Sequence, residues 1–407
     1  MSIRESAKLT QRPSIIEVRP LQDGDRQLVP AMIAQAFVLP PHRFEQDKRV
    51  PAAECRVLTH DQAVVASLRF ERVGQFFGGM PVPAAAISAV QVVPECRGRG
   101  FGKLLFREVI QELHQTDVAL ATLFPTNVGF YRGIGFEIAG AHTKYLVPLT
   151  AISRRRGSAE VVRCTTDDHP SIKACYRTVA TQSVGLIDRP DSWWEHRIFG
   201  GNGDAPVYTY LVRNNGMVSG YMTYVHDPDP REIYYAFTLG CRDFVWHDAE
   251  TACALLDLAA AHPVVGINLT WSGPAREPLS QFIAGQDIRI ERSRRWMLRL
   301  VNLRAALSAR TFAPDITTAV ILDVRDPVVH SNSGPHRIIV SGGRAEVERT
   351  HSAATTSSVN TLAALYSGWL TAADAFRCGL LPGATVHDLR ALDTIFAAPA
   401  AWTMETF

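Results

Sequence analysis

The feature that most constrains this chain is a glycine cluster between an apolar segment and an amphipathic one. Residues 86–93 are mostly apolar and end at Pro94, and three glycines then follow in the run Arg97-Gly98-Arg99-Gly100-Phe101-Gly102. From Phe101 to Leu113, apolar side chains recur at helical spacing. The pattern therefore predicts a buried strand, a glycine-rich turn and a helix in direct succession.

Such a turn has the properties of a phosphate-binding site. Glycines let the backbone approach a ligand closely, and the first turn of a helix carries unpaired N–H groups and partial positive charge. Arg97 and Arg99 add two cations. Together these features predict a pyrophosphate cradle, although a plain strand-to-helix connection also uses glycine. The dinucleotide-binding Gly-x-Gly-x-x-Gly and the Gly-Lys-Ser/Thr of a Walker A loop are both unmatched.

A second motif makes the cluster specific. Arg97–Gly102 resembles the R-x-x-G-x-G/A signature of GNAT acetyltransferases, and Phe130-Tyr131-Arg132-Gly133-Ile134-Gly135-Phe136 resembles their F-Y-x-x-x-G-F signature. Two signatures in this order are more specific than either alone. The resemblance, which covers residues 86–136, implies an acetyl-CoA-dependent N-acetyltransferase.

The resemblance also implies where acetyl-CoA is held. The glycine cluster would bind its diphosphate, the end of the preceding strand would pair with the pantetheine amides, and two residues would lie beside the thioester. The implied residues are Val90, Gln91, Val92, Arg97, Gly98, Arg99, Gly100, Phe101, Gly102, Thr126 and Asn127.

Tyr131 is the implied general acid. A phenol has an ordinary pKa near ~10, so it is protonated at neutral pH and can donate a proton to the departing thiolate. Taken without the resemblance, the same tyrosine is better explained as a core aromatic that packs the last strand. Phe130 is expected to be the packing member of the pair.

The order of predicted elements repeats after an arginine-rich linker at 153–158. The later copy contains a hairpin at Asn214-Asn215-Gly216, because Asn-Gly favours positive φ. A third region, from about Trp296, mixes strands and helices. We therefore expect an α/β and α+β chain with two tandem GNAT-like domains, 1–153 and 154–296, and a third domain, 297–407.

The complete plan resembles the enhanced intracellular survival (Eis) family. That family has an active N-terminal GNAT domain, a degenerate central one and a sterol-carrier-protein-like C-terminal domain. Residues Arg295–Arg299 and the terminal Thr406-Phe407 also match. The central region lacks the arginine-glycine signature and has Gly240–Phe244 ahead of its helix, so one acetyl-CoA site per chain is expected. A homohexamer is implied as well.

In that family the C-terminal carboxylate serves as the amine-side base, and here this role falls to Phe407. An α-carboxylate has an ordinary pKa of ~3.3–3.7, so it would act mainly by attracting a cationic amine and taking its proton during attack. A frayed terminus is the ordinary alternative. Relatives often have an acid immediately before the terminal aromatic, whereas here Thr406 stands in that place and Glu405 one position earlier.

The resemblance implies amines of polycationic small molecules as substrates, aminoglycosides first, at one or several positions. Lysine-bearing peptides are an alternative, and a lipid-binding module with a vestigial GNAT site is another. Position and residue type suggest a substrate cleft; its candidate residues are Phe37, Phe44 and Glu405.

Composition excludes several other classes. The net charge of +2 over 407 residues gives no case for a nucleic-acid partner. There is no metal-binding pair such as His-Glu-x-x-His, and so no metal is expected. No run approaches the ~20 apolar residues that a membrane span needs. Without a recognisable leader, and with seven cysteines outside any paired motif, the chain is predicted to be cytoplasmic.

Overall fold

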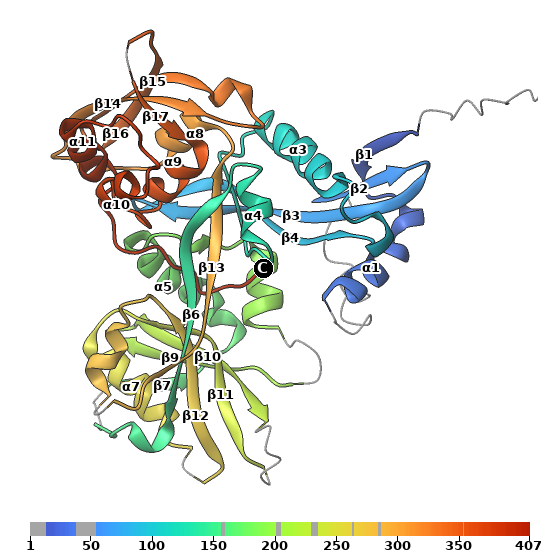
Figure 1. Ribbon diagram of the computed structural model, residues 1–407. Coiled ribbons are helices and arrows are strands. Elements are labelled where there is room, and N and C mark those ends of the chain that lie inside the picture. The colour runs from blue at the N-terminus through green and yellow to red at the C-terminus, as the bar shows by residue number, and fades with distance from the viewer. Residues whose placement is uncertain are drawn as a thin grey trace, which may run out of the picture. The chain divides into compact units, whose positions relative to one another are not determined.

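The computed structural model describes most of the chain (Figure 1). The described ranges are 14–37, 54–155, 159–200, 205–228, 235–262, 264–283, 286–352 and 354–407. The chain forms two compact units. The first combines Met1–Glu71 with Ile87–Glu112, and the second combines Arg72–Ala86 with Leu113–Phe407. Strands β3 (Ala63–Phe77) and β4 (Met80–Val92) contribute to both units.

The first unit contains an antiparallel arrangement beside two helices. Strand β1 (Ile16–Pro20) pairs with β2 (Cys55–His60), which pairs with β3. Strands β2 and β3 form a hairpin that turns through Asp61 and Gln62, both at positive φ. The helices are α1 (Leu28–Phe37) and α3 (Phe101–His114). The helix predicted after the glycine cluster is therefore confirmed, and an ion pair from Arg56 to Glu112 links it to β2.

In the second unit, three strands far apart in the sequence lie side by side. Strand β5 (Leu120–Leu123) and β6 (Glu137–Pro148) both pair with β13 (Arg289–Leu300), which lies between them. The helix α4 (Val128–Arg132) connects β5 to β6. A strand at Trp296 was expected to open the third domain. The strand at this place, β13, begins earlier, at Arg289. Its buried end, Trp296–Leu300, pairs with β5 on one side and with β6 on the other.

The central elements follow the predicted repeat. They are β7 (Glu160–Arg163), α5 (His169–Gln182), β8 (Ile187–Asp188), α6 (Asp191–Trp193), β9 (Tyr208–Asn214), β10 (Met217–Pro228), β11 (Phe237–Trp246), α7 (Ala249–Ala259) and β12 (Gly266–Gly273). Asn215 and Gly216 have φ of 49° and 79°, which confirms the predicted hairpin turn. The β12–β6 pairing joins these strands to β13 in the order β13-β6-β12-β11-β10-β9-β7.

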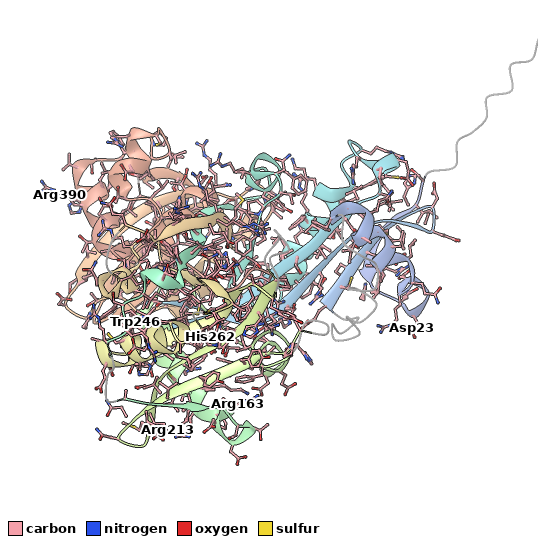
Figure 2. All side chains as sticks on the ribbon, turned by 90° about the horizontal axis from the view of Figure 1, so that it is seen from below. Asp23, Arg163, Arg213, Trp246, His262 and Arg390 are labelled. Carbon is pink, nitrogen blue, oxygen red and sulfur yellow. The ribbon has the colours of Figure 1, made fainter. Side chains whose placement is uncertain are left out.

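The C-terminal elements form a four-stranded sheet with helices. They are α8 (Leu303–Ala309), β14 (Thr317–Arg325), β15 (Gly334–Ser341), β16 (Arg344–Arg349), β17 (Thr355–Ser358), α9 (Val359–Tyr366), α10 (Ala372–Arg377) and α11 (Val386–Phe396). The strand order is β16-β15-β14-β17. Trp296 and Leu298 of β13 share one hydrophobic core with Leu322 of this sheet and Leu365 of α9. On α11 Leu392 faces that core, whereas Arg390 points away from it into solvent (Figure 2).

The predicted fold class, α/β and α+β, is confirmed. No helix within the described ranges has the length and apolar character needed to cross a membrane.

Candidate active site

The glycine cluster forms an open turn in the first unit. Gly98 and Gly100 have φ of +76° and +84°, which an L side chain rarely adopts, and a Cβ added at either would meet no atom within 4 Å. Arg97 and Arg99 are exposed. The Arg97 Nε donates to the carbonyl of Val92 at 3.1 Å, which ties the turn to the end of β4.

This turn fits a diphosphate. The bond from Leu104 N to Gly100 O closes the first turn of α3, so the amides before Leu104 lack helical partners. Phe101 anchors the helix start by burial at 5% exposure, while the Arg99 guanidinium lies 4.9 Å from its ring centroid. Open space, helix amides and two cations are the elements that bind a pyrophosphate.

Strand β4 bends immediately before the residues expected to pair with pantetheine. Ala89 has φ of +48°, a conformation that strains a non-glycine residue and breaks the regular pleat. Gln91 is buried, and its side-chain amide donates to the Ser67 hydroxyl at 2.9 Å. Because that side chain points inward, Val90 and Val92 on either side lie half-buried toward the opposite face.

In the second unit, the segment after β5 positions Tyr131. Asn127 caps α4 by accepting from the backbone N–H of Phe130 at 3.1 Å. Tyr131 is 5% exposed and lies edge-on to Phe130 with ring centroids 5.1 Å apart. Burial raises the pKa of Tyr131 to about 12, against a smaller opposing effect of its hydrogen bond with Thr126. The phenol is therefore protonated at every physiological pH and can donate.

The glycine of the second signature has a structural cause. Gly135 has φ of +91°, and a Cβ there would meet the Arg299 side chain. Arg299 is fully buried, donates to the Ile134 carbonyl at 2.7 Å, and pairs with Asp326 at 2.7 and 2.8 Å. The bend that follows Tyr131 is thus held by β13.

The last residues of the chain are docked within the second unit. Ala141 of β6 donates to the Ala401 carbonyl and accepts from Thr403 N, both at 3.2 Å. The Phe407 ring lies edge-on to Phe124, with centroids 5.3 Å apart, and 5.9 Å from Trp193. Phe124 directly follows β5 and precedes the Thr126–Tyr131 segment. The fold therefore brings Phe407 to the end of β5, as a frayed terminus would not.

Of the expected substrate residues, Phe37 lies in the first unit and Glu405 in the second. Glu405 is 7% exposed, and its two oxygens are bonded to Arg189 and Thr403. A charge in the interior must be paired, and both carboxylate oxygens of Glu405 have partners. Phe37 packs at the edge of the cluster formed by Val29, Ile33 and Val57 in the first unit. Phe44 lies outside the described residues.

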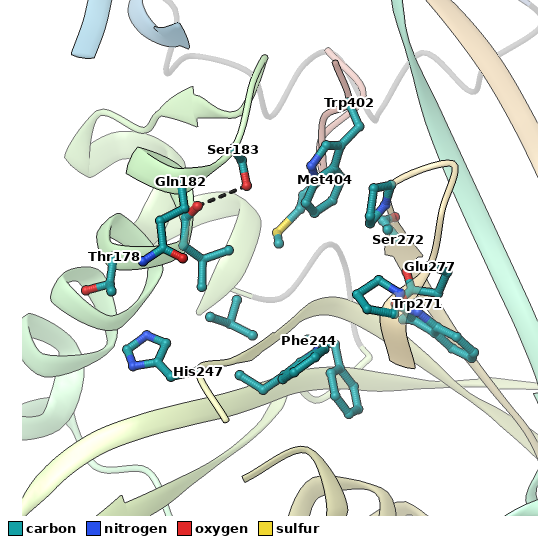
Figure 3. A pocket seen from close by; sticks show the side chains of 16 residues that line it. Thr178, Gln182, Ser183, Phe244, His247, Trp271, Ser272, Glu277, Trp402 and Met404 are labelled. Carbon is teal, nitrogen blue, oxygen red and sulfur yellow. Dashed lines mark hydrogen bonds between the residues drawn. The ribbon is translucent and has the colours of Figure 1, made fainter. Parts of the chain in front are cut away.

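A pocket of about 400 Å³ lies in the central region, where sequence reasoning expected no site (Figure 3). Strands β11 and β12 pair in parallel only as far as Gly240 and Thr270, and the pocket opens beyond that point. Phe244 and Trp271 form one side, α5 another, and Trp402 and Met404 of the C-terminal segment a third. Burial raises the pKa of the Glu277 carboxyl in its wall to about 7.

Comparison with known proteins agrees with this geometry. Residues 17–139 and 185–300 match two models of the acetyltransferase (GNAT) domain, and residues 303–404 match the sterol carrier protein domain. The chain is a GNAT N-acetyltransferase. The expectation of two tandem GNAT domains followed by a sterol-carrier-protein-like domain is therefore confirmed.

Three proteins resemble this GNAT N-acetyltransferase over nine tenths or more of its length. An uncharacterized N-acetyltransferase of Streptomyces avermitilis is 26% identical over 407 residues, covering 91% of this chain and 92% of the relative. A GCN5-related N-acetyltransferase from Anabaena variabilis superimposes with a TM-score of 0.91 at 25% identity, covering 97% of this chain and 100% of that one. Eis1 from Mycobacterium abscessus shares the fold, with a TM-score of 0.79 at 21% identity and coverage of 97% and 100%.

The co-substrate of GNAT domains is acetyl-CoA, and the glycine cluster fits its diphosphate. Among the residues that the structure describes, no group of three or more His, Cys, Asp or Glu side chains is arranged to hold a metal ion.

Proposed function

We propose that this enzyme transfers acetyl directly from acetyl-CoA to amines of polycationic small molecules, aminoglycosides first, at one or several positions. Tyr131 acts as general acid to the departing thiolate, and the α-carboxylate of Phe407 receives the amine proton. The Val90–Val92 segment, the Arg97–Gly102 turn and the Thr126-Asn127 pair bind acetyl-CoA. The substrate class rests on the resemblance to the Eis family.

The observation that carries the proposal is the position of the chain end. Phe407 packs on Phe124 beside the segment that holds Tyr131. The chain end carries a negative charge at neutral pH, whatever its sequence. A negative charge attracts an ammonium group, lowers the cost of bringing it out of water and accepts its proton as attack proceeds.

The two residues have complementary roles in the transfer. The amine nitrogen forms a bond to the acetyl carbonyl carbon, the bond from that carbon to sulfur breaks, and the sulfur leaves as a thiol. Tyr131 supplies the proton to sulfur, because its raised pKa keeps the phenol protonated. The Phe407 carboxylate takes the proton that the amine loses, so charge does not accumulate on either partner.

The assembly and location follow the same resemblance. We propose a homohexamer that acts in the cytoplasm, with acetyl-CoA and Tyr131 held by residues 1–153 and the base supplied by Phe407. Size measurement by light scattering tests the assembly, and a monomer would contradict it.

The test is CoA-thiol release by the purified chain with an unmodified C-terminus. Acetyl-CoA is supplied with aminoglycosides, with lysine-bearing peptides, and with neutral sugars as the matched control. Thiol release with aminoglycosides, and mass increments of one or more acetyl groups on the drug, is the expected result. Turnover of peptides alone would replace the substrate class. Binding of lipid without any turnover would instead support a carrier role.

A further inference from the structure

A buried ionic cluster in the central region holds the C-terminal segment. Its members are Arg189, which follows β8, Asp243 of β11, and Glu405, two residues before the chain end. The Arg189 and Asp243 side chains are 0% exposed, and that of Glu405 is 6% exposed. None of these residues belongs to either GNAT signature, and all three lie in the second unit.

Arg189 is held from every side. Its two terminal nitrogens donate to the two Asp243 oxygens at 2.6 and 2.8 Å, which is the bidentate arrangement of strong pairs. The rings of Tyr176 and Trp194 lie 3.9 and 4.6 Å from its central carbon. Asp243 also accepts from the Tyr221 hydroxyl at 2.7 Å. The guanidinium therefore has one orientation, and its Nε points at the C-terminal segment.

That remaining nitrogen donates to Glu405. The second Glu405 oxygen accepts from the Thr403 hydroxyl at 3.0 Å, and that hydroxyl in turn accepts from Glu405 N at 3.3 Å. Met404 contributes its carbonyl to His142 Nε2 at 3.1 Å. Each residue from Trp402 to Glu405 thus has at least one hydrogen bond to another part of the second unit.

Two glycines make room for the segment. A Cβ at Gly140 would lie 2.4 Å from the Trp296 ring and 2.6 Å from the Ala401 carbonyl oxygen, and one at Gly185 would lie 2.7 Å from the Trp402 carbonyl oxygen. Gly185 also has φ of +96°. Gly140 of β6 and Gly185, in the connection between α5 and β8, therefore both lie where the backbone of the segment passes close by. A side chain at either glycine would collide with the backbone of the C-terminal segment.

We infer that Arg189 and Asp243 are positioning residues, which hold Glu405 so that the terminal carboxylate of Phe407 stays at the end of β5. The inference rests on the proposed function, because it assigns the central domain a part in the same reaction. The central GNAT domain lacks the glycine-rich phosphate turn. In this interpretation it instead holds the C-terminal residues that supply the base for the N-terminal GNAT domain.

The physical reason lies in the alternatives available to a chain end. Terminal residues fray unless they are tied down, and apolar contacts alone allow a short segment to slide by one residue. A bidentate ionic cluster in the interior has one satisfactory geometry, and an unpaired charge left there is costly. One Glu405 oxygen is bonded to Arg189 and the other to Thr403, so Glu405 cannot leave without breaking both contacts.

The experiment compares Glu405→Gln with wild type. Glutamine keeps the shape but removes the charge that faces Arg189. Hydrogen exchange of peptide 398–407 is measured alongside kcat, the KM for acetyl-CoA and the pH dependence of kcat. We expect tail exchange to rise at least tenfold and kcat to fall at least tenfold, with the KM for acetyl-CoA within twofold. Glu405→Asp, which retains the charge, should recover part of kcat.

Two further variants keep the test decisive. Thr403→Val removes only the hydroxyl that supports Glu405 and should move both readouts in the same direction by about threefold, even if Glu405→Gln fails to fold. Arg213→Gln breaks an Arg213–Asp168 pair of the same domain that does not contact the tail. It should leave tail exchange and kcat unchanged while lowering the melting temperature.

The outcomes distinguish the role of the ionic cluster from the acetyl transfer itself. Unchanged tail exchange in Glu405→Gln and Thr403→Val contradicts the inference that the cluster holds the C-terminal segment. Faster exchange with unchanged kcat shows a structural anchor only and overturns the positioning role. A wild type that acetylates no amine overturns the proposed function, and in that case the exchange rates alone show whether Arg189 holds the tail.

Discussion

The two GNAT domains differ most at the turn that follows their equivalent strands. After β4 the chain has Arg97–Gly102, with glycines at positive φ and an open helix start. After β11 it has Trp246-His247-Asp248, and the Asp248 carboxylate accepts from Thr251 N at 2.8 Å. The first turn leaves helix amides for an anion, whereas the second occupies them with its own negative charge.

The difference shows how a duplicated fold can divide its work. The order of strand, turn and helix is retained in both domains, so the sheet and core are retained too. What changes is which groups remain unpaired. The first domain leaves amides and arginines exposed at a turn, and the central domain uses Asp243 of β11 to bind Arg189. Fold and chemistry are therefore separable along this chain.

The largest effect on turnover is expected at Tyr131, the residue proposed to donate a proton. Tyr131→Phe removes the hydroxyl and keeps the ring packing, so we expect kcat to fall about 10²-fold with acetyl-CoA affinity within twofold. Steady-state kinetics and calorimetric titration with acetyl-CoA measure the two quantities. A variant with wild-type kcat would exclude Tyr131 as the general acid.

The next largest effect is expected at the glycine turn. In Gly100→Val a β-branched residue must adopt φ of +84° and project into the open space beside the turn. We expect the KM for acetyl-CoA to rise about tenfold or more through the loss of diphosphate contacts. Initial rates over a range of acetyl-CoA concentrations measure it. An unchanged KM would mean that the diphosphate binds elsewhere.

A third prediction concerns pH and the docked tail. Burial lowers the pKa of His142, opposed by Glu405 and the Met404 carbonyl and aided by Arg294 and Lys144. Because the folded pKa lies below the unfolded one, stability is complete above the ordinary histidine value near ~6.5 and is lost as pH falls below it. Melting temperatures at pH 7.5 and 5.5 test this, and His142→Gln should show a smaller loss. Equal losses would remove His142 as the cause.

The central turn offers the matched control for the first. Asp248→Ala removes the cap of α7 and should cost about 1 kcal/mol of folding stability. It should leave the KM for acetyl-CoA unchanged, because this turn has no proposed part in binding. Urea unfolding and steady-state kinetics report the two effects. A changed KM would show that the central domain takes part in acetyl-CoA binding.

The smallest effect is expected in the central pocket. Burial raises the pKa of Glu277 to about 7, so its charge is disfavoured in the folded state. A raised carboxyl pKa gives stability at low pH that is lost as pH rises through 7. Glu277→Gln should therefore stabilise the protein at pH 8 by on the order of 1 kcal/mol and have little effect at pH 5. Turnover should not change, since Glu277 lies outside the proposed machinery.

Local physics made much of the fold predictable. Asn215-Gly216 forms a hairpin because few other residues adopt positive φ at low cost. Helix α9 covers Val359–Tyr366, and its apolar spacing and the cap from Ser358 are both encoded within that short stretch. The glycine cluster was likewise visible as a turn. Each of these signals is contained within about ten residues.

The set of elements, the two GNAT signatures and the pattern of repetition could therefore be predicted from local sequence. The position of β13 between β5 and β6, and the burial of Glu405 against Arg189, could not be predicted in this way. These pairings join residues more than 140 positions apart. The free energy of these pairings depends on burial and geometry in the folded chain. The residues next to a strand edge or a charged side chain do not indicate which distant partner it will contact.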